Sequence, residues 1–241
     1  MTKAGCLAAA LGALVTAPAN AQQMTWTDKG FVNVNLGGQS GSRDLTTDST
    51  FELYAEQGNL STTQEVGGGA LFDFSAGYKV WRNLALGMGY SRTGSDSDVA
   101  IAAAVPDPVF FDRLRNLTAA ATGADHSENA FHIQGTWVMP VTDTLDVSFS
   151  AGPTIFNVSQ DIPSAITVNE PGPTLASTTI VDASETTLGF HFGADVNYFF
   201  TPRFGAGLLA RYSFGSVEFD VANDSISVGG FQIGAGLRYR F

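Results

Sequence analysis

The chain has 241 residues, 44% of them hydrophobic, and its 23 Asp and Glu residues against 12 Lys and Arg residues give a formal charge of −11. This length suits one all-β domain, and the acidic balance excludes nucleic acid as a partner, because phosphate binding needs clustered Lys and Arg. Beyond the N-terminus there is no run of about 18 apolar residues, which excludes helical membrane spans.

The N-terminus has the pattern of a secretory signal peptide. Lys3 supplies the positive charge, residues 7–15 form an apolar core, and residues 19–21 fit a small-x-small cleavage site. We predict that residues 1–21 are cleaved, that the mature chain begins at Gln22, and that residues 22–241 form one domain. A buried N-terminal helix is the alternative. Cys6 is the only cysteine and lies in the signal, so we expect no disulfide and no cofactor held by thiolates.

Eight segments of the mature chain alternate apolar and polar residues with a period of two, which is typical of a strand with two unlike faces. The last one, GGFQIGAGLRYRF, places aromatic and aliphatic residues on one face and glycine, glutamine and arginine on the other. The eight segments are residues 31–38, 70–81, 84–92, 130–138, 145–155, 186–199, 204–214 and 229–241.

Short and long connections alternate between these segments. Tight turns fall at 82–83, 140–144 and 200–203, whereas the long connections are 39–69, 93–129, 156–185 and 215–226. The long connections hold 18 of the 23 acidic residues. This pattern predicts an all-β fold, an eight-stranded antiparallel up-and-down transmembrane β-barrel with tight periplasmic turns and long extracellular loops.

Aromatic residues gather at both ends of the predicted strands, as expected of the girdles of a membrane barrel. The predicted periplasmic girdle is Trp81, Trp137, Tyr198, Phe204, Tyr239 and Phe241. The predicted extracellular girdle is Tyr90, Phe131, Phe156, Phe190, Tyr212, Phe214 and Phe231.

The signal, the segment FSAGYKVWRNLALGMGYSR at 74–92 and the terminal LRYRF resemble the small eight-stranded outer-membrane β-barrel proteins of the OmpA, OmpX and OmpW type. The resemblance covers the mature chain and implies a monomer in the outer membrane of a Gram-negative bacterium. It also implies three partners: lipid, lipopolysaccharide and, during biogenesis, the barrel-assembly machinery. In this family the terminal aromatic is similar to an assembly signal, a role that would fall to Phe241. The alternative is that Phe241 is only an interfacial aromatic.

The inward faces of the predicted strands carry opposite charges in a space about eight strands wide. Because unpaired buried charge is costly, we predict an ion-pair network that fills the lumen, in which Arg211 and Asp195 take part. The alternative is that the same ion pairs form a gate that opens for small solutes. The inward-facing glycines either make room for the long arginines or leave a narrow column of water. The predicted network is Asp73, Lys79, Asp146, Asp195, Arg211 and Arg238.

The sequence gives little support to catalysis or metal binding. Its three histidines, His126, His132 and His191, come with no nucleophile elbow and no metal-ligand spacing. Acidic runs such as DSD at 96–98 are either a solvated surface or a place for divalent cations. We therefore predict a protein that is not an enzyme.

One predicted loop, PDPVFFDRLRNL at 106–117, is rich in apolar residues. Phe110, Phe111 and Leu114 fall near one helical face, which suggests a lid on the barrel mouth; contact with the outer leaflet or with an apolar ligand or partner are alternatives. We expect a structural or surface-interaction role with a side-chain-filled lumen. The second hypothesis is a narrow channel for small or hydrophobic molecules, and the third is an enzyme.

Overall fold

The computed structural model describes residues 25–218 and 225–241, so the predicted signal peptide and Gln22 lie outside the described residues. Within these ranges, no helix is long and apolar enough to cross a bilayer. The strands are β1 (Gly30–Ser40), β2 (Ser42–Leu53), β3 (Glu56–Gly67), β4 (Ala70–Trp81), β5 (Leu84–Pro106), β6 (Leu114–Pro140), β7 (Leu145–Asn169), β8 (Thr174–Phe199), β9 (Phe204–Glu218) and β10 (Ser225–Arg240).

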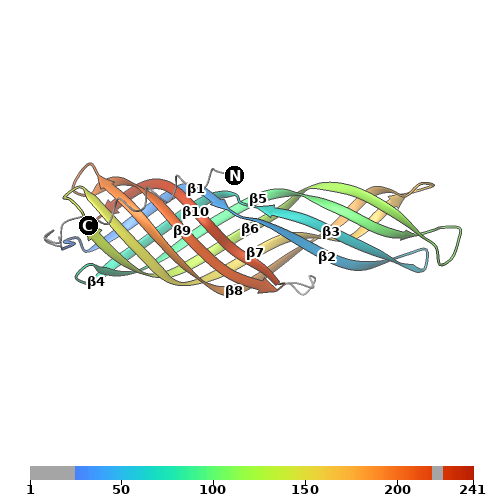
Figure 1. Cartoon of the computed structure of the whole chain (residues 1–241), viewed down its shortest axis with the longest axis horizontal. Coiled ribbons are helices and arrows are strands. Elements are labelled where there is room, and N and C mark those ends of the chain that lie inside the picture. The colour runs from blue at the N-terminus through green and yellow to red at the C-terminus, as the bar shows by residue number, and fades with distance from the viewer. Residues whose placement is uncertain (1–24, 219–224) are drawn as a thin grey trace, which may run out of the picture.

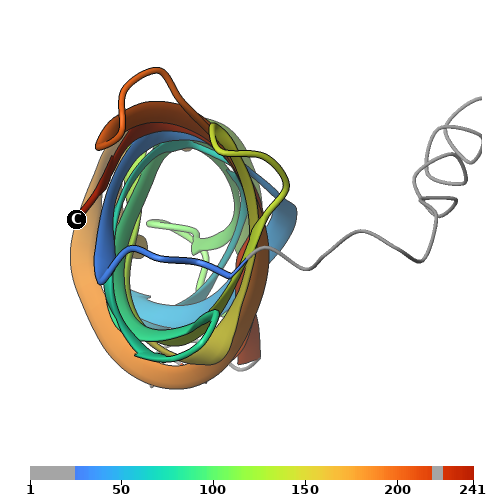
Figure 2. The same ribbon diagram turned by 90° about the vertical axis from the view of Figure 1, so that its left-hand side faces the viewer.

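Eight strands, β1 and β4–β10, close into an antiparallel barrel. Each pairs with its neighbour in the order β4-β1-β10-β9-β8-β7-β6, and β5 completes the ring by pairing with both β6 and β4. Figure 2 shows the closed ring from one end. The predicted eight-stranded up-and-down barrel is therefore confirmed.

The long connections, however, are mostly strand, and the expectation of long loops was wrong. Strands β5 to β8 run for 23, 27, 25 and 26 residues, well beyond the roughly 10 that a tilted membrane strand needs. The first long connection forms the β2–β3 hairpin, which pairs with β5 from Asn59↔Ala104 to Gln64↔Val99. We call β2, β3, residues 96–125 and residues 161–182 the extension, and the rest of the barrel the barrel base (Figure 1).

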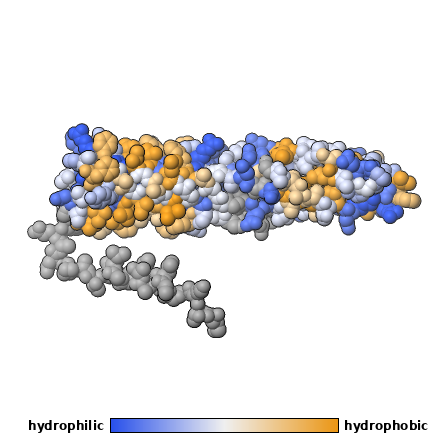
Figure 3. Space-filling view, turned by 90° about the horizontal axis from the view of Figure 1, so that it is seen from above, coloured by the Kyte–Doolittle hydropathy of each residue, from blue (hydrophilic) through white to orange (hydrophobic). Residues whose placement is uncertain are grey.

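The inside and outside of the molecule exchange polarity between these two parts. On β5 in the barrel base, Leu86 and Met88 are 58% and 71% exposed on the outer face, while Ser91 is buried inside. Farther along the same strand, Val99 and Ile101 are buried inside the extension. Apolar colour accordingly covers the end of the molecule nearer the C-terminus, and the extension is more polar outside (Figure 3). The apolar exterior of the barrel base matches a lipid environment. The extension, with a polar exterior and an apolar core, matches a part of the protein that is surrounded by water.

The extension has a hydrophobic core of its own, which explains why it is folded rather than loose. Leu60 of β3, Leu117 of β6 and Ile166 of β7 meet the β5 residues there. Complete burial of such side chains stabilises a fold by about 1.5–3 kcal/mol each. The core cluster is Leu60, Val99, Ile101, Ala103, Val105, Leu117, Ala124 and Ile166.

Aromatic side chains form neighbouring pairs near both ends of the barrel base. The ring centroids of Phe204 and Tyr239 lie 5.0 Å apart, and those of Tyr90 and Phe131 lie 5.1 Å apart. Phe156, placed in a girdle by the sequence, is instead 1% exposed and faces inward among Ala130, Val158 and other buried side chains. It lies one residue past the predicted strand end, and the continuing period of two turns it inward.

Candidate functional site in the lumen and at the distal tip

Two buried ion pairs lie at the centre of the barrel base. Arg211 Nη1 is 2.6 Å from Asp73 Oδ2, and Arg238 Nη2 is 3.0 Å from Asp195 Oδ1. Asn35 joins them, because its amide donates to Asp73 at 2.8 Å and its carbonyl oxygen accepts from Arg238 at 2.6 Å. The structure thus brings four of the six predicted network residues into one chain of hydrogen bonds.

A glycine makes room for the Arg238 guanidinium. A Cβ added at Gly207 would lie 2.6 Å from both Arg238 Nε and Asn197 Oδ1, two atoms that are themselves hydrogen-bonded at 2.6 Å. Any larger residue at position 207 would displace this contact. At this position, the inward glycine accommodates a long arginine.

The other two predicted network residues lie nearer the end of the barrel that carries the tight turns. Asp146 faces Arg240 at 3.3 Å, and Arg240 also approaches Asp28 at 3.5 Å. Lys79 donates to the main-chain carbonyl oxygen of Trp26 and lies 5.5 Å from the centroid of the Trp26 ring. The predicted set of six therefore forms two groups, and Lys79 stands beside an aromatic rather than a carboxylate.

Trp26 is a lumen residue that the sequence analysis missed. Only 3% of it is exposed, and it packs with Phe31, Ala85 and Val138 inside the barrel. Its main-chain N–H donates to Asn83 at 3.2 Å. The segment before β1 crosses the mouth of the barrel, drawn in blue in Figure 2. We call this segment, residues 25–29, the N-terminal strap.

A second polar layer contains two of the three histidines. Thr154 Oγ1 lies 2.9 Å from Nδ1 of both His132 and His191, whose rings are 4.6 Å apart. Ser91 Oγ is 3.0 Å from His132 Nε2, the separation of a serine and its general base. All four side chains are buried. The Ser91–His132 pair is therefore enclosed among buried polar side chains of the lumen.

A third layer lies where the barrel base meets the extension. Glu128 accepts from Gln39 at 2.9 Å and from the main-chain N–H of Gly229 at 3.1 Å. His126 lies 2.6 Å from Gln160 and 3.2 Å from Glu128. Above this layer the buried side chains are mainly apolar, with Thr47 and Thr62 among them.

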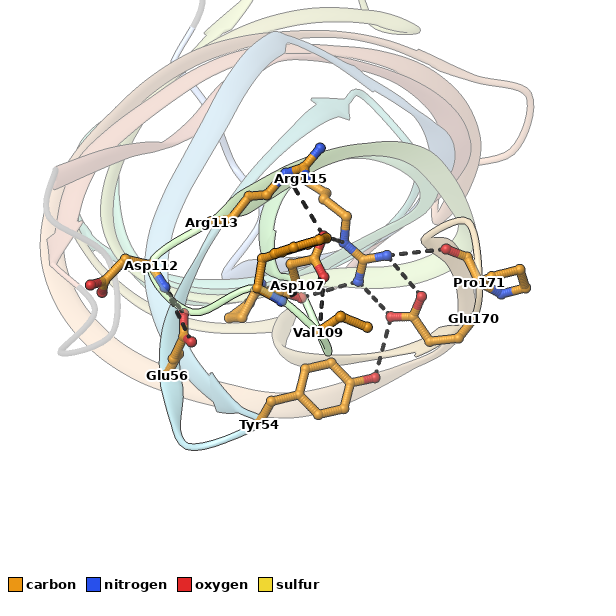
Figure 4. Close-up of polar contacts among 11 residues, drawn as sticks. Tyr54, Glu56, Asp107, Val109, Asp112, Arg113, Arg115, Glu170 and Pro171 are labelled. Carbon is orange, nitrogen blue, oxygen red and sulfur yellow. Dashed lines mark hydrogen bonds and ion pairs between the residues drawn. The ribbon is translucent and has the colours of Figure 1, made fainter.

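At the distal tip, three hairpin turns are tied together by hydrogen bonds around the Arg115–Glu170 pair. Arg115, at the start of β6, reaches both carboxylate oxygens of Glu170 in the β7–β8 turn, at 2.8 and 2.5 Å. Tyr54 in the β2–β3 turn donates to the same carboxylate at 3.3 Å. The main-chain N–H of Asp112 donates to Glu56 at 3.2 Å, as Figure 4 shows.

These contacts shift the pKa values of the tip residues. The hydrogen bonds from Arg115 lower the pKa of Glu170, and the same bonds raise the pKa of Arg115. The main-chain N–H of Val109, together with that of Phe110, lowers the pKa of Asp107. At neutral pH Arg115, Glu170 and Asp107 are therefore charged.

The apolar residues of the predicted loop are exposed at this tip. Val109, Phe110, Phe111 and Leu114 are 77%, 57%, 75% and 47% exposed. The segment is a turn and not the expected helical face, because Asp107 accepts the N–H groups of the residues that follow it, at 2.9 and 3.2 Å. We call these four residues the tip patch.

A row of aspartates crosses the outer face where the extension begins. Asp96 and Asp125 are direct cross-strand neighbours, as are Asp161 and Asp182, and the N–H of Asp125 donates to Asp161 at 3.2 Å. The hydrogen bond with Asp96 and the negative charge of that residue raise the pKa of Asp125. Among the described residues, no group of three or more candidate ligands is arranged to hold a metal ion.

Phe241 lies at the seam that closes the barrel. Its carbonyl oxygen accepts the N–H groups of Lys29 and Gly30 at 2.5 and 3.1 Å, and its side chain is 45% exposed. The predicted role of this residue in assembly stays a prediction.

Solved structures similar to this chain include three outer-membrane proteins. Neisserial surface protein A is 14% identical with a TM-score of 0.48, the match covering 88% of this chain and 97% of that one. Ail of Yersinia pestis, solved with the heparin analogue sucrose octasulfate, is 11% identical with a TM-score of 0.40, covering 88% and 99%. OprG of Pseudomonas aeruginosa is 10% identical with a TM-score of 0.44, covering 89% and 96%. A search among curated proteins found no match.

A family model described as the outer membrane protein beta-barrel domain matches residues 6–241, nearly the whole chain. The match includes all eight barrel strands and the tip hairpins. The predicted location in the bacterial outer membrane is thereby confirmed. The chain belongs to the outer membrane protein beta-barrel family.

Proposed function

We propose that this protein is a surface-interaction protein, in which the barrel base is a membrane anchor with a side-chain-filled lumen and the extension carries the function. The observation that supports this most is the apolar core of the extension. Four barrel strands continue far beyond the length that a membrane needs, and their interior becomes hydrophobic where a pore would need water.

The contents of the barrel base support the same proposal. The Arg211–Asp73 and Arg238–Asp195 pairs, the histidine layer and the strap with Trp26 occupy successive levels along its axis. An eight-stranded barrel is just wide enough for side chains to fill. We infer that no continuous column of water passes through the protein.

A narrow channel for small molecules is the second candidate function. Buried polar atoms favour it, because Gln134 Oε1, Thr136 Oγ1 and His191 Nε2 have no hydrogen-bond partner among the described residues. Such atoms bind water when space allows. These atoms lie at several levels along the barrel axis. The buried ion pairs lie between them and interrupt any path that bound water would form.

Single-protein recordings in planar bilayers separate the two candidates. The intact protein is expected to give silence or small, rare openings. A wide porin recorded in the same bilayers is the control that shows that an open lumen is detected. Large and steady openings of the intact protein would contradict the anchor proposal and support the channel.

A further inference from the structure

The tip patch is an exposed apolar surface on an ordered base. Val109, Phe110 and Phe111 are adjacent, each more than half exposed, and apolar colour marks the far end of the extension in Figure 3. A contiguous exposed apolar patch on a monomer marks an interaction site. Aromatic residues in such a patch are the usual anchors of a protein interface.

The base of the patch is held by two neighbouring hairpins. Arg115 binds Glu170 through two hydrogen bonds and also donates to the Pro106 carbonyl oxygen at 3.1 Å. The Arg113 guanidinium lies 5.3 Å from the centroid of the Phe110 ring. A surface that is ordered before binding loses little conformational entropy when a partner arrives.

The surroundings of the patch are acidic. The three hairpin tips contribute five carboxylates, Glu52, Glu56, Asp107, Asp112 and Glu170, against two cations, Arg113 and Arg115, which gives 2 − 5 = −3. Both cations already face carboxylates, since Arg113 lies 3.9 Å from Asp107 and Arg115 lies 2.5 Å from Glu170. The complementary surface is apolar at its centre and basic at its edge.

Two other occupants fit this chemistry poorly. A second copy in the same membrane has its Lys29, Arg82 and Arg203 at the opposite end of the barrel, before β1 and in the β4–β5 and β8–β9 turns. A lipid surface would receive only four apolar side chains while the acids around them approached the headgroups. Because acidic residues oppose insertion, a protein pocket is favoured over a bilayer.

We propose that the tip patch binds a protein that offers an apolar pocket rimmed by lysine and arginine, with Phe110 and Phe111 as the inserted anchors. This inference rests on the proposed surface-interaction function and names the surface and the class of partner. The acidic rim accelerates encounter at low salt, and the phenylalanines hold the complex.

The test uses the full protein in phosphatidylcholine nanodiscs and two fluorescent amphipathic peptides, one of leucine and lysine and one of leucine and glutamate. Binding to empty nanodiscs is subtracted. We expect the lysine peptide to bind. The double substitution Phe110→Ser/Phe111→Ser is expected to reduce the affinity for this peptide roughly tenfold or more, which corresponds to about 1.4 kcal/mol. Glu56→Gln/Asp112→Asn is expected to weaken it at low salt, and the glutamate peptide to bind far more weakly.

Matched controls lie on the side of the extension. Ile180→Ser/Val181→Ser removes apolar side chains that are 46% and 45% exposed, and is expected to leave binding unchanged. Equal losses in the control and tip variants would overturn the proposal, as would unchanged binding in the tip variant. Phenylalanine-dependent capture of phosphatidylcholine vesicles would assign the patch to lipid and also overturn it.

Failure of this inference is separable from failure of the proposed function. Steady conductance by the intact protein contradicts the anchor proposal, whatever the peptides do. A silent protein whose tip variant binds the lysine peptide like the wild type contradicts only the assignment of the tip patch.

Discussion

Removing one partner of the Arg211–Asp73 pair is expected to destabilise the barrel strongly. The two side chains are 2% and 0% exposed and 2.6 Å apart, so the substitution Arg211→Met leaves the Asp73 carboxylate without its cation. Stranding a buried charge in this way costs about 3–5 kcal/mol. With a urea dependence of ~2 kcal/mol per molar, the unfolding midpoint falls by roughly 2 M.

The matched control is Arg203→Met, which removes an exposed arginine from the β8–β9 turn. Its expected cost is about 0–1 kcal/mol, because a solvated charge contributes little. Both variants are unfolded by urea from lipid vesicles, and tryptophan fluorescence reports the midpoint.

A double variant sharpens the test. Asp73→Asn alone strands Arg211, whereas Asp73→Asn/Arg211→Met strands neither charge, so the double variant is expected to lie closer to the wild type than either single variant. If the two losses simply add, or if Arg211→Met and Arg203→Met unfold at the same midpoint, the buried-pair account is refuted.

Two further predictions follow from the geometry. Gly207→Ala brings a Cβ to 2.6 Å from Arg238 Nε and is expected to cost about 1–3 kcal/mol in urea unfolding, whereas Gly172→Ala, whose Cβ meets nothing within 4 Å, is expected to be neutral; equal effects would contradict the tight fit. Asp125 has a raised pKa when folded, so its carboxylate weakens the fold as pH rises through that pKa. Asp125→Asn is therefore expected to unfold at higher urea than the wild type at pH 7, and this gain should vanish below the ordinary carboxyl pKa of 3.8; a loss of stability at pH 7 would show that the aspartate row is not repulsive.

The barrel strands could be predicted from the sequence because lipid outside and polar groups inside give a strong period of two. Leu86 and Met88 against Gly87 and Gly89 show it plainly. The extension follows the same period with the polarity reversed, since Val99, Ile101 and Val105 are apolar on the inner face. The apolar residues of β5 therefore move from the outward-facing positions of the barrel base to the inward-facing positions of the extension. A search for lipid-facing apolar residues loses the strand at that point. The alternation in VAIAAAV, residues 99–105, would have revealed it.

The lumen could be predicted in composition but not in pairing. Several cations and anions face inward, and the sequence placed Arg211 and Asp195 in one ion-pair network without assigning their direct partners. In the structure, Arg211 meets Asp73, and Asn35 and Arg238 connect this pair to Asp195. Partners across a lumen depend on strand register and barrel tilt, which a period of two does not determine.

The contributions of Trp26 and Arg115 arise from contacts between distant segments. Trp26 lies outside every strand, and its hydrogen bonds reach residues 53 and 57 positions away. Arg115 meets Glu170 across 55 positions. Local pattern carries no information about such pairs. The exposed phenylalanines of the tip, by contrast, were recognisable as a patch that needs an explanation.

Hydrogen exchange of the main-chain amides in residues 99–105 tests most directly whether the extension is a folded platform and not a set of loops. With the full protein in nanodiscs, we predict exchange roughly a thousandfold slower than in an unstructured peptide, equivalent to about 4 kcal/mol of opening free energy. The amide of Gly172 in the β7–β8 turn serves as the internal reference and is predicted to exchange faster. Exchange of residues 99–105 at the rate of an unstructured peptide would contradict the account.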